Sequence, residues 1–87
     1  MGLIYRMNGK ILPNGKILNT ADLGKLISKK RKFMQLTQSE FAALSGVGVR
    51  FISELENGKE SIHLGKALKI LANMGFELHV LPRKWGK

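Results

Sequence analysis

The segment Leu36–Lys59, LTQSEFAALSGVGVRFISELENGK, decides the fold, because it has the pattern of two short helices joined by a tight turn. Thr37 and Glu40 have the spacing of a capping box, which predicts the start of the first helix. Gly46 permits the positive φ that a tight turn requires. The second helix is expected to begin at Gly48 or one residue later and to stop at the Asn-Gly pair of residues 57–58. Such a pair allows its second helix to protrude into a DNA major groove, which is about 12 Å wide.

Small and apolar residues mark where these two helices would meet. Ala42 is small at the expected crossing point, and Val47 is apolar in the turn. The residues expected to face the core are Phe41, Leu44, Ile52 and Leu55. The outer face at the start of the second helix is then left with Gly48, Val49, Arg50, Ser53 and Glu54. These outer residues are the candidates for contact with DNA.

Helical periodicity continues on both sides of the pair. A preceding helix, capped by Thr20 or Asp22 and ending near Gln35, has an apolar face made of Leu23, Leu26, Ile27, Phe33 and Met34. A following helix, flanked or capped by His63, has an apolar stripe made of Leu64, Ala67, Leu68, Leu71 and Met74. Phe76–Leu81 then alternates like a half-buried strand. A lone strand needs a partner, and a second copy across a two-fold axis is the simplest one, with the N-terminal segment as the alternative.

The N-terminal segment, residues 1–19, has a different sequence pattern from the helical part of the chain. Asn-Gly-Lys-Ile-Leu occurs twice, at 8–12 and 14–18, and Asn-Gly pairs favour turns. The segment is therefore expected to be a small hairpin or a basic arm. The chain divides into 1–19 (arm or hairpin), 20–75 (DNA-binding domain) and 76–87 (dimerisation strand and basic tail).

Composition limits the function. The 87 residues suit one small domain, and 15 Lys and Arg against 6 acids give a net charge of +9, which favours nucleic acid, an anionic membrane or an acidic protein. The chain has no Cys and only two His, so we expect no metal and no cofactor. No catalytic constellation is recognisable, which argues against an enzyme. No apolar run approaches the ~20 residues that span a bilayer, so we expect no membrane partner and a cytoplasmic protein.

The central segment resembles the Cro and phage-repressor (XRE) helix-turn-helix family over roughly residues 23–75. The matching residues are Thr37-Gln38, Glu40, Ala42, Gly46-Val47, Ile52 and Leu55–Lys59. The resemblance implies a mainly α, four-helix domain that binds double-stranded DNA at a palindromic operator. It implies base reading by Gly48, Val49, Arg50 and Glu54, and phosphate contacts by Thr37, Gln38, Ser53, Asn57 and Lys59. Lys30, in the basic run beside the motif, is a further phosphate candidate, and Arg31 and Glu56 are expected to form a structural ion pair.

Two positions depart from that family pattern. Gly48 stands where Ser or Thr usually caps the recognition helix, and Val49 stands where a polar residue is common. Val49 offers only apolar contact, for example to a thymine methyl group. Direct readout is therefore expected to fall mainly on Arg50, whose guanidinium fits guanine O6 and N7. Modest base readout leaves a share of specificity to DNA shape.

The whole chain resembles the HipB-like antitoxins through its basic first helix, Gly46–Lys59, Leu68–Leu71 and the strand Phe76–Leu81. This resemblance implies a homodimeric repressor that binds a HipA-like kinase toxin and represses its own operon. It also implies C-terminal strands that pair across the dimer, here through Phe76, Leu78 and Val80. Trp85 is expected either to anchor a partner or to fold over the paired strands. Two alternatives stay open: a stand-alone phage-type repressor, and a protein-interaction module that reads no DNA.

Overall fold

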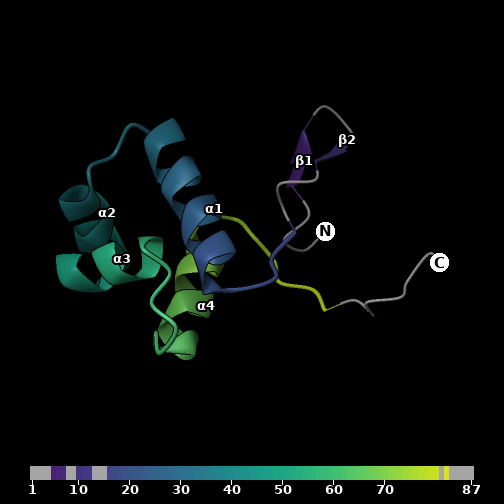
Figure 1. Cartoon of the computed structure of the whole chain (residues 1–87). Coiled ribbons are helices and arrows are strands. Elements are labelled where there is room, and N and C mark those ends of the chain that lie inside the picture. Colours follow the sequence, from purple (N-terminus) through teal and green to yellow (C-terminus); the bar gives the residue numbers. More distant parts are fainter. Residues whose placement is uncertain (1–4, 8–9, 13–15, 81, 83–87) are drawn as a thin grey trace.

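The computed structural model describes residues 5–7, 10–12, 16–80 and 82. The elements are β1 (Tyr5–Met7), β2 (Lys10–Leu12), α1 (Thr20–Phe33), α2 (Gln38–Ser45), α3 (Val49–Glu56) and α4 (Leu64–Asn73) (Figure 1). β1 and β2 pair antiparallel, with Arg6 opposite Ile11. Residues 5–7 and 10–12 of the N-terminal segment are thus paired strands, and the assignment of this segment as a separate arm or hairpin stays a prediction.

The described helices enclose one apolar core. Its buried residues are Leu23, Leu26, Ile27, Phe41, Ala42, Ile52, Leu55, Ala67, Ile70, Leu71 and Met74. Val47 in the turn between α2 and α3 packs against this core, as expected. Ile27, Ile52 and Ala67 have no exposed surface at all. The helix-turn-helix core predicted from Ala42, Ile52 and Leu55 is therefore confirmed.

Several residues predicted to be in the core are exposed, and those predictions were wrong. Phe33 is 74% exposed and Leu44 is 72% exposed; Met34, Leu64 and Leu68 are also exposed. Phe33 and Met34 lie where α1 ends, in its last turn and at its C-cap, and Leu44 lies in the last turn of α2. The predicted stripe of α4 is confirmed at Ala67, Leu71 and the C-cap Met74, whereas Ile70 is buried in place of Leu64 and Leu68.

The start of α1 also differs from the prediction. Asn19, rather than Thr20 or Asp22, is the N-cap, because its side-chain oxygen accepts a hydrogen bond from the Asp22 backbone N–H at 2.8 Å. Thr20 instead donates its hydroxyl to the Gly58 carbonyl at 2.7 Å. This bond ties the beginning of α1 to the loop that follows α3.

Local signals set both ends of α2. The Thr37 hydroxyl accepts from the Glu40 N–H at 3.0 Å, and the Glu40 carboxylate accepts from the Thr37 N–H at 2.8 Å. The predicted capping box is thus complete. Gly46 ends the helix with a φ of 72°, the left-handed conformation that favours glycine. His63 is the N-cap of α4, and its Nδ1 accepts from the Lys66 N–H at 3.1 Å.

Residues 76–80 lie in no strand of this single chain. Phe76 packs against the core, and its N–H donates to the Leu71 carbonyl at 2.9 Å. Leu78 is exposed, and Val80 is 91% exposed. Pairing of this segment with a second copy stays a prediction, and Leu81 and Trp85 fall outside the described residues.

Candidate DNA-binding surface

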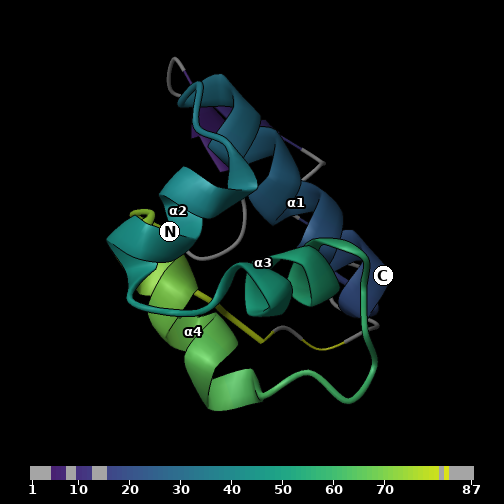
Figure 2. The same ribbon diagram turned by 90° about the vertical axis from the view of Figure 1, so that its left-hand side faces the viewer.

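Helix α3 presents one buried side and one open side. Ile52 and Leu55 hold it against the core, whereas Gly48, Val49 and Arg50 at its beginning are exposed. In Figure 2 α3 lies on the face of the domain that is turned to the viewer, in front of α1. Gly48, Val49 and Arg50 therefore lie at an exposed helix start, which is the geometry that a major groove requires. Glu54, the fourth candidate base-reading residue, lies about one turn further along α3 and is only partly exposed.

The approach of α1 to α3 depends on Gly24. A Cβ atom at this position would lie 2.5 Å from the carbonyl oxygens of Leu55 and Glu56. Gly24 is buried in the middle of α1, where glycine lowers helix stability by roughly 0.5–1 kcal/mol relative to alanine. The sequence reasoning missed this role, although a glycine inside a helical pattern is the signal that could have revealed it.

Glu54 lies between two cations on the outer side of α3. Its carboxylate pairs with Arg50 Nε at 3.2 Å and with Lys59 Nζ at 3.3 Å. The hydrogen bond from Lys59 is the largest cause and lowers the pKa of Glu54; burial acts in the opposite direction, and the hydrogen bond from Arg50 lowers the pKa further. The Arg50 side chain is 89% exposed. Glu54 therefore stays ionised and orients Arg50 while leaving the guanidinium accessible.

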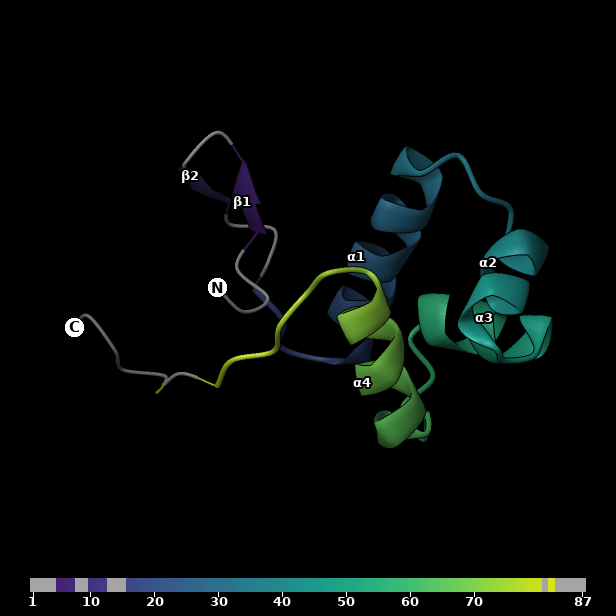
Figure 3. The ribbon, with the colours of Figure 1, turned by 180° about the vertical axis from the view of Figure 1, so that it is seen from behind.

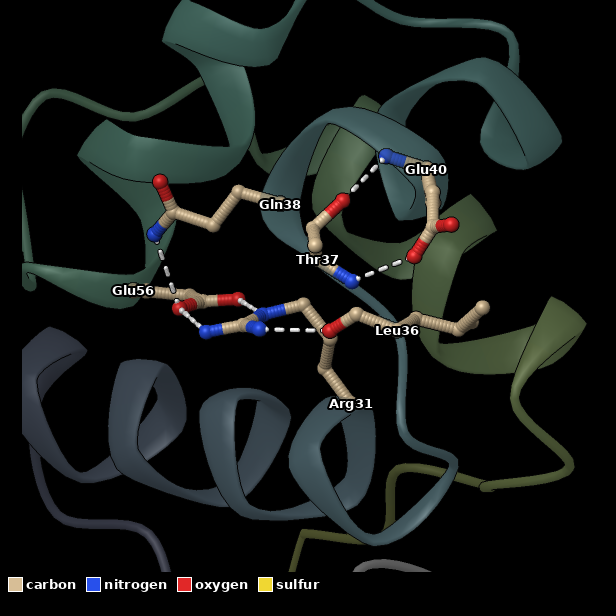
Figure 4. A network of polar contacts seen from close by, with 6 residues as sticks. All are labelled: Arg31, Leu36, Thr37, Gln38, Glu40 and Glu56. Atoms are coloured by element: carbon tan, nitrogen blue, oxygen red, sulfur yellow. Dashed lines mark hydrogen bonds and ion pairs between the residues drawn. The ribbon is translucent and has the colours of Figure 1, made fainter.

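A buried polar network joins α1, α2 and α3 behind this surface (Figure 4). Arg31 Nε donates to Glu56 Oε2 at 2.6 Å, and a second guanidinium nitrogen donates to Glu56 Oε1 at 3.0 Å. The third nitrogen donates to the Leu36 carbonyl at 2.7 Å, and the Gln38 amide donates to Glu56 Oε1 at 3.0 Å. The ion pair predicted for Arg31 and Glu56 is present, with both side chains almost fully buried.

The network also determines the charge state of its members. The hydrogen bond that Arg31 donates to the Glu56 carboxylate raises the pKa of Arg31. Burial by itself would raise the pKa of Glu56, but hydrogen bonds from Arg31 and then Gln38 outweigh it, so this pKa is lowered. Both groups remain charged, and each compensates the other in a site with little access to water.

The structure does not bring all candidate phosphate-contacting residues to the surface of the α2–α3 pair. Gln38 at the start of α2 and Asn57 and Lys59 after α3 border the outer face of the helix pair. The Thr37 hydroxyl is occupied by its cap. Lys30 lies elsewhere, since its ammonium nitrogen is 5.8 Å from the ring centres of both Phe33 and Phe76. Such distances allow cation–π attraction, which engages Lys30 with its own chain.

Within the part of the chain that the structure describes, no group of three or more His, Asp or Glu residues could hold a metal ion. No helix among these residues is long and apolar enough to cross a membrane.

Known proteins share this arrangement. A family model described as helix-turn-helix matches residues 27–81. A HTH-type transcriptional regulator of Sinorhizobium fredii (strain NBRC 101917 / NGR234), y4mF, is 41% identical over 66 residues, which are 76% of this chain and 87% of that protein. Two solved structures, a HipB-O4 20mer complex and a HipA-HipB-O2-O3 complex, are each 28% identical with a TM-score of 0.69, covering 79% of this chain and 97% of theirs. The chain therefore belongs to the XRE-type helix-turn-helix family and is a transcriptional regulator of that class.

Proposed function

We propose that this regulator is a sequence-specific repressor that also serves as the antitoxin of a type II toxin–antitoxin system. The observation that carries the DNA-binding part is the exposed beginning of α3 above the buried Ile52 and Leu55. Base edges are read there by Arg50, with Gly48, Val49 and Glu54 beside it. Gln38, Ser53, Asn57 and Lys59 contact phosphates around them.

Arg50 carries most of the direct readout. It is the one exposed cation among the candidate base-reading residues of α3, and Glu54 holds its Nε at 3.2 Å. The pair is exposed, so its own stability is small and Arg50 exchanges Glu54 for a guanine edge at little cost. Gly48 offers no side-chain cap, and a Cβ there would meet nothing within 4 Å, so the DNA backbone can approach the start of α3 closely.

The active form is a homodimer on a palindromic operator. Large apolar side chains are exposed on α4, at Leu64 and Leu68, and in the segment after it, at Leu78 and Val80. Figure 3 shows the C-terminal segment leaving the helical domain at the end of α4. Pairing of residues 76–81 with the same segment of a second copy covers Leu78 and Val80. The two α3 helices then read half-sites about one helical turn apart.

A HipA-like kinase toxin is the proposed protein partner, and the complex represses its own operon. Support comes from the HipB structures, one of which is a HipA-HipB-O2-O3 complex. Their likeness to this chain extends over 97% of their own length and 79% of this chain. Trp85 in the basic tail is proposed as an anchor for this partner.

A stand-alone repressor is the second candidate. The relative from Sinorhizobium fredii is described only as a transcriptional regulator, with no toxin in its name. Both candidates bind DNA through the same surface, and they differ only in the protein partner.

Co-expression with the product of the neighbouring reading frame tests the antitoxin proposal. We expect a kinase-like protein to co-purify with the tagged chain, and the complex to bind the DNA upstream of the gene. Purification of the chain alone, as a dimer that still binds this DNA, contradicts the antitoxin role and leaves a stand-alone repressor. If no duplex can be selected from a random pool, both the antitoxin and the stand-alone repressor proposals are contradicted.

A further inference from the structure

A row of lysines lies along one side of α1, outside the predicted DNA contacts. Lys25, Lys29 and Lys32 follow at intervals of four and three residues, so they share one helix face. Together with Lys16, just before α1, they line a hollow of about 480 Å³. We call Lys16, Lys25, Lys29 and Lys32 the lysine row. Lys30 is outside it, since it lies over the Phe33 and Phe76 rings.

The lysine row keeps most of its positive charge unbalanced. Two carboxylates, Asp22 and Glu56, share the same hollow. Glu56 is already paired with Arg31 at 2.6 Å, and Asp22 accepts a hydrogen bond from the Leu18 N–H at 3.0 Å. Four lysines therefore share the hollow with two carboxylates, and one of these carboxylates, Glu56, is already neutralised by Arg31. The remaining charge attracts a polyanion.

The position of the row says which polyanion fits. At its far end Glu56 is bonded to Gln38, the predicted phosphate contact at the start of α2. At its near end α1 is tied to the loop after α3 by the bond from Thr20 to the Gly58 carbonyl, next to Asn57 and Lys59. The lysine row thus runs between two groups of predicted phosphate contacts and continues the same surface.

From these contacts we infer that the lysine row binds the phosphate backbone of duplex DNA beside the half-site that α3 reads. This inference rests on the proposed DNA binding and extends its footprint. Lys25 to Lys32 spans roughly 10 Å at 1.5 Å per residue, the length of about three nucleotides of one strand at 3.4 Å each. The contacts carry no sequence information and lengthen the site outward.

Salt dependence of binding tests the inference. The affinities of the wild type and of K25Q/K29Q/K32Q are measured by fluorescence anisotropy, from about 50 to 200 mM salt. The probe is a duplex selected from a random pool, with flanks extending ten base pairs beyond the half-sites. Each lost phosphate contact reduces the slope of log K against log salt by about 0.9, so we expect the slope to fall by about 2 to 3. The preference for the selected sequence over a scrambled duplex stays unchanged.

Two controls make the result specific. K69Q removes one exposed charge on α4 and is expected to leave the slope unchanged, whereas K29Q reduces it by about 1. A duplex cut at the edge of the half-sites is expected to bind the triple variant as well as it binds the wild type. Circular dichroism confirms that the variants are folded.

A wild-type salt slope in the folded triple variant overturns the inference while leaving the proposed function intact. The inference is also overturned if the triple variant keeps the wild-type salt slope but no longer co-purifies with a protein partner, because the lysine row then contacts an acidic protein and not DNA. If the wild type itself binds no duplex, the proposed function fails and the inference fails with it.

Discussion

In this domain, the residue proposed to read DNA and the residues that stabilise the fold are different side chains. Arg50 and Arg31 belong to neighbouring helices, yet one is 89% exposed and the other is buried against Glu56. An exposed pair such as Arg50–Glu54 is worth roughly 0–1 kcal/mol, whereas removing one member of a buried pair costs roughly 3–5 kcal/mol. Substitutions at these two arginines should therefore affect different properties.

Arg50→Ala should weaken binding to the selected operator by about 1–3 kcal/mol, or roughly 5- to 150-fold, because a bidentate contact to guanine is lost. The melting temperature should change little. Anisotropy titrations check the affinity, and Arg50→Lys, which keeps the charge but not the planar fork, should recover only part of it. Unchanged affinity in Arg50→Ala would show that this residue reads no base.

Glu56→Gln should lower the free energy of unfolding by about 3–5 kcal/mol at pH 7, because Arg31 is left buried without a counter-charge. Glu56 has a lowered folded-state pKa, so its contribution is complete above the unfolded value of about 4.3 and is lost as the pH falls through the folded value. The difference in free energy of unfolding between the wild type and the variant should therefore decrease as the pH is lowered from 5 to 3, because protonation of Glu56 removes its contribution from the wild type. Urea titrations at each pH measure this, and a constant gap would contradict the pairing.

At the scale of elements, the crossing of α1 and α3 depends on backbone contact at Gly24. Gly24→Ala should destabilise the domain by more than about 1 kcal/mol, despite alanine's better helix propensity, because the added Cβ meets carbonyl oxygens at 2.5 Å. Gly48→Ala is the matched control, since a Cβ there meets nothing within 4 Å and φ is −75°. Thermal unfolding followed by circular dichroism compares them, and equal melting temperatures would contradict the close approach.

At the scale of the whole molecule, the proposed homodimer is expected to bury the exposed side chains of Leu78 and Val80. L78E/V80E should convert a dimer into a monomer, because charges in a paired strand interface lose their hydration. Leu44→Glu, which charges a 72% exposed leucine on α2, should leave the dimer intact. Light scattering after size exclusion gives the masses. A dimer that persists in L78E/V80E places the interface outside residues 76–81.

The secondary structure of the helix-turn-helix could be predicted because its signals are local. The capping box of Thr37 and Glu40, the left-handed Gly46 and the Asn57-Gly58 stop each act within a few residues. The pairing of Arg31 with Glu56 was expected only from the family resemblance, because the two residues are 25 positions apart and no local signal joins them. The residues expected to contact DNA stay a prediction; the structure shows that Gly48, Val49 and Arg50 are exposed at the start of α3.

Only the tertiary structure decided which side of each flanking helix is buried. Phe33, Leu44 and Leu68 fit an apolar periodicity and are nevertheless exposed, because burial depends on where another helix crosses and where each helix ends. The same long-range packing placed the Phe76 ring 5.8 Å from the Lys30 ammonium and set the lysine row beside Glu56. The sequence by itself determined the presence of the helices, the capping box of α2 and the helix-turn-helix motif, since these depend on neighbours along the chain. The angles at which the helices cross determined the rest, since contacts between residues more than twenty positions apart have no local signal.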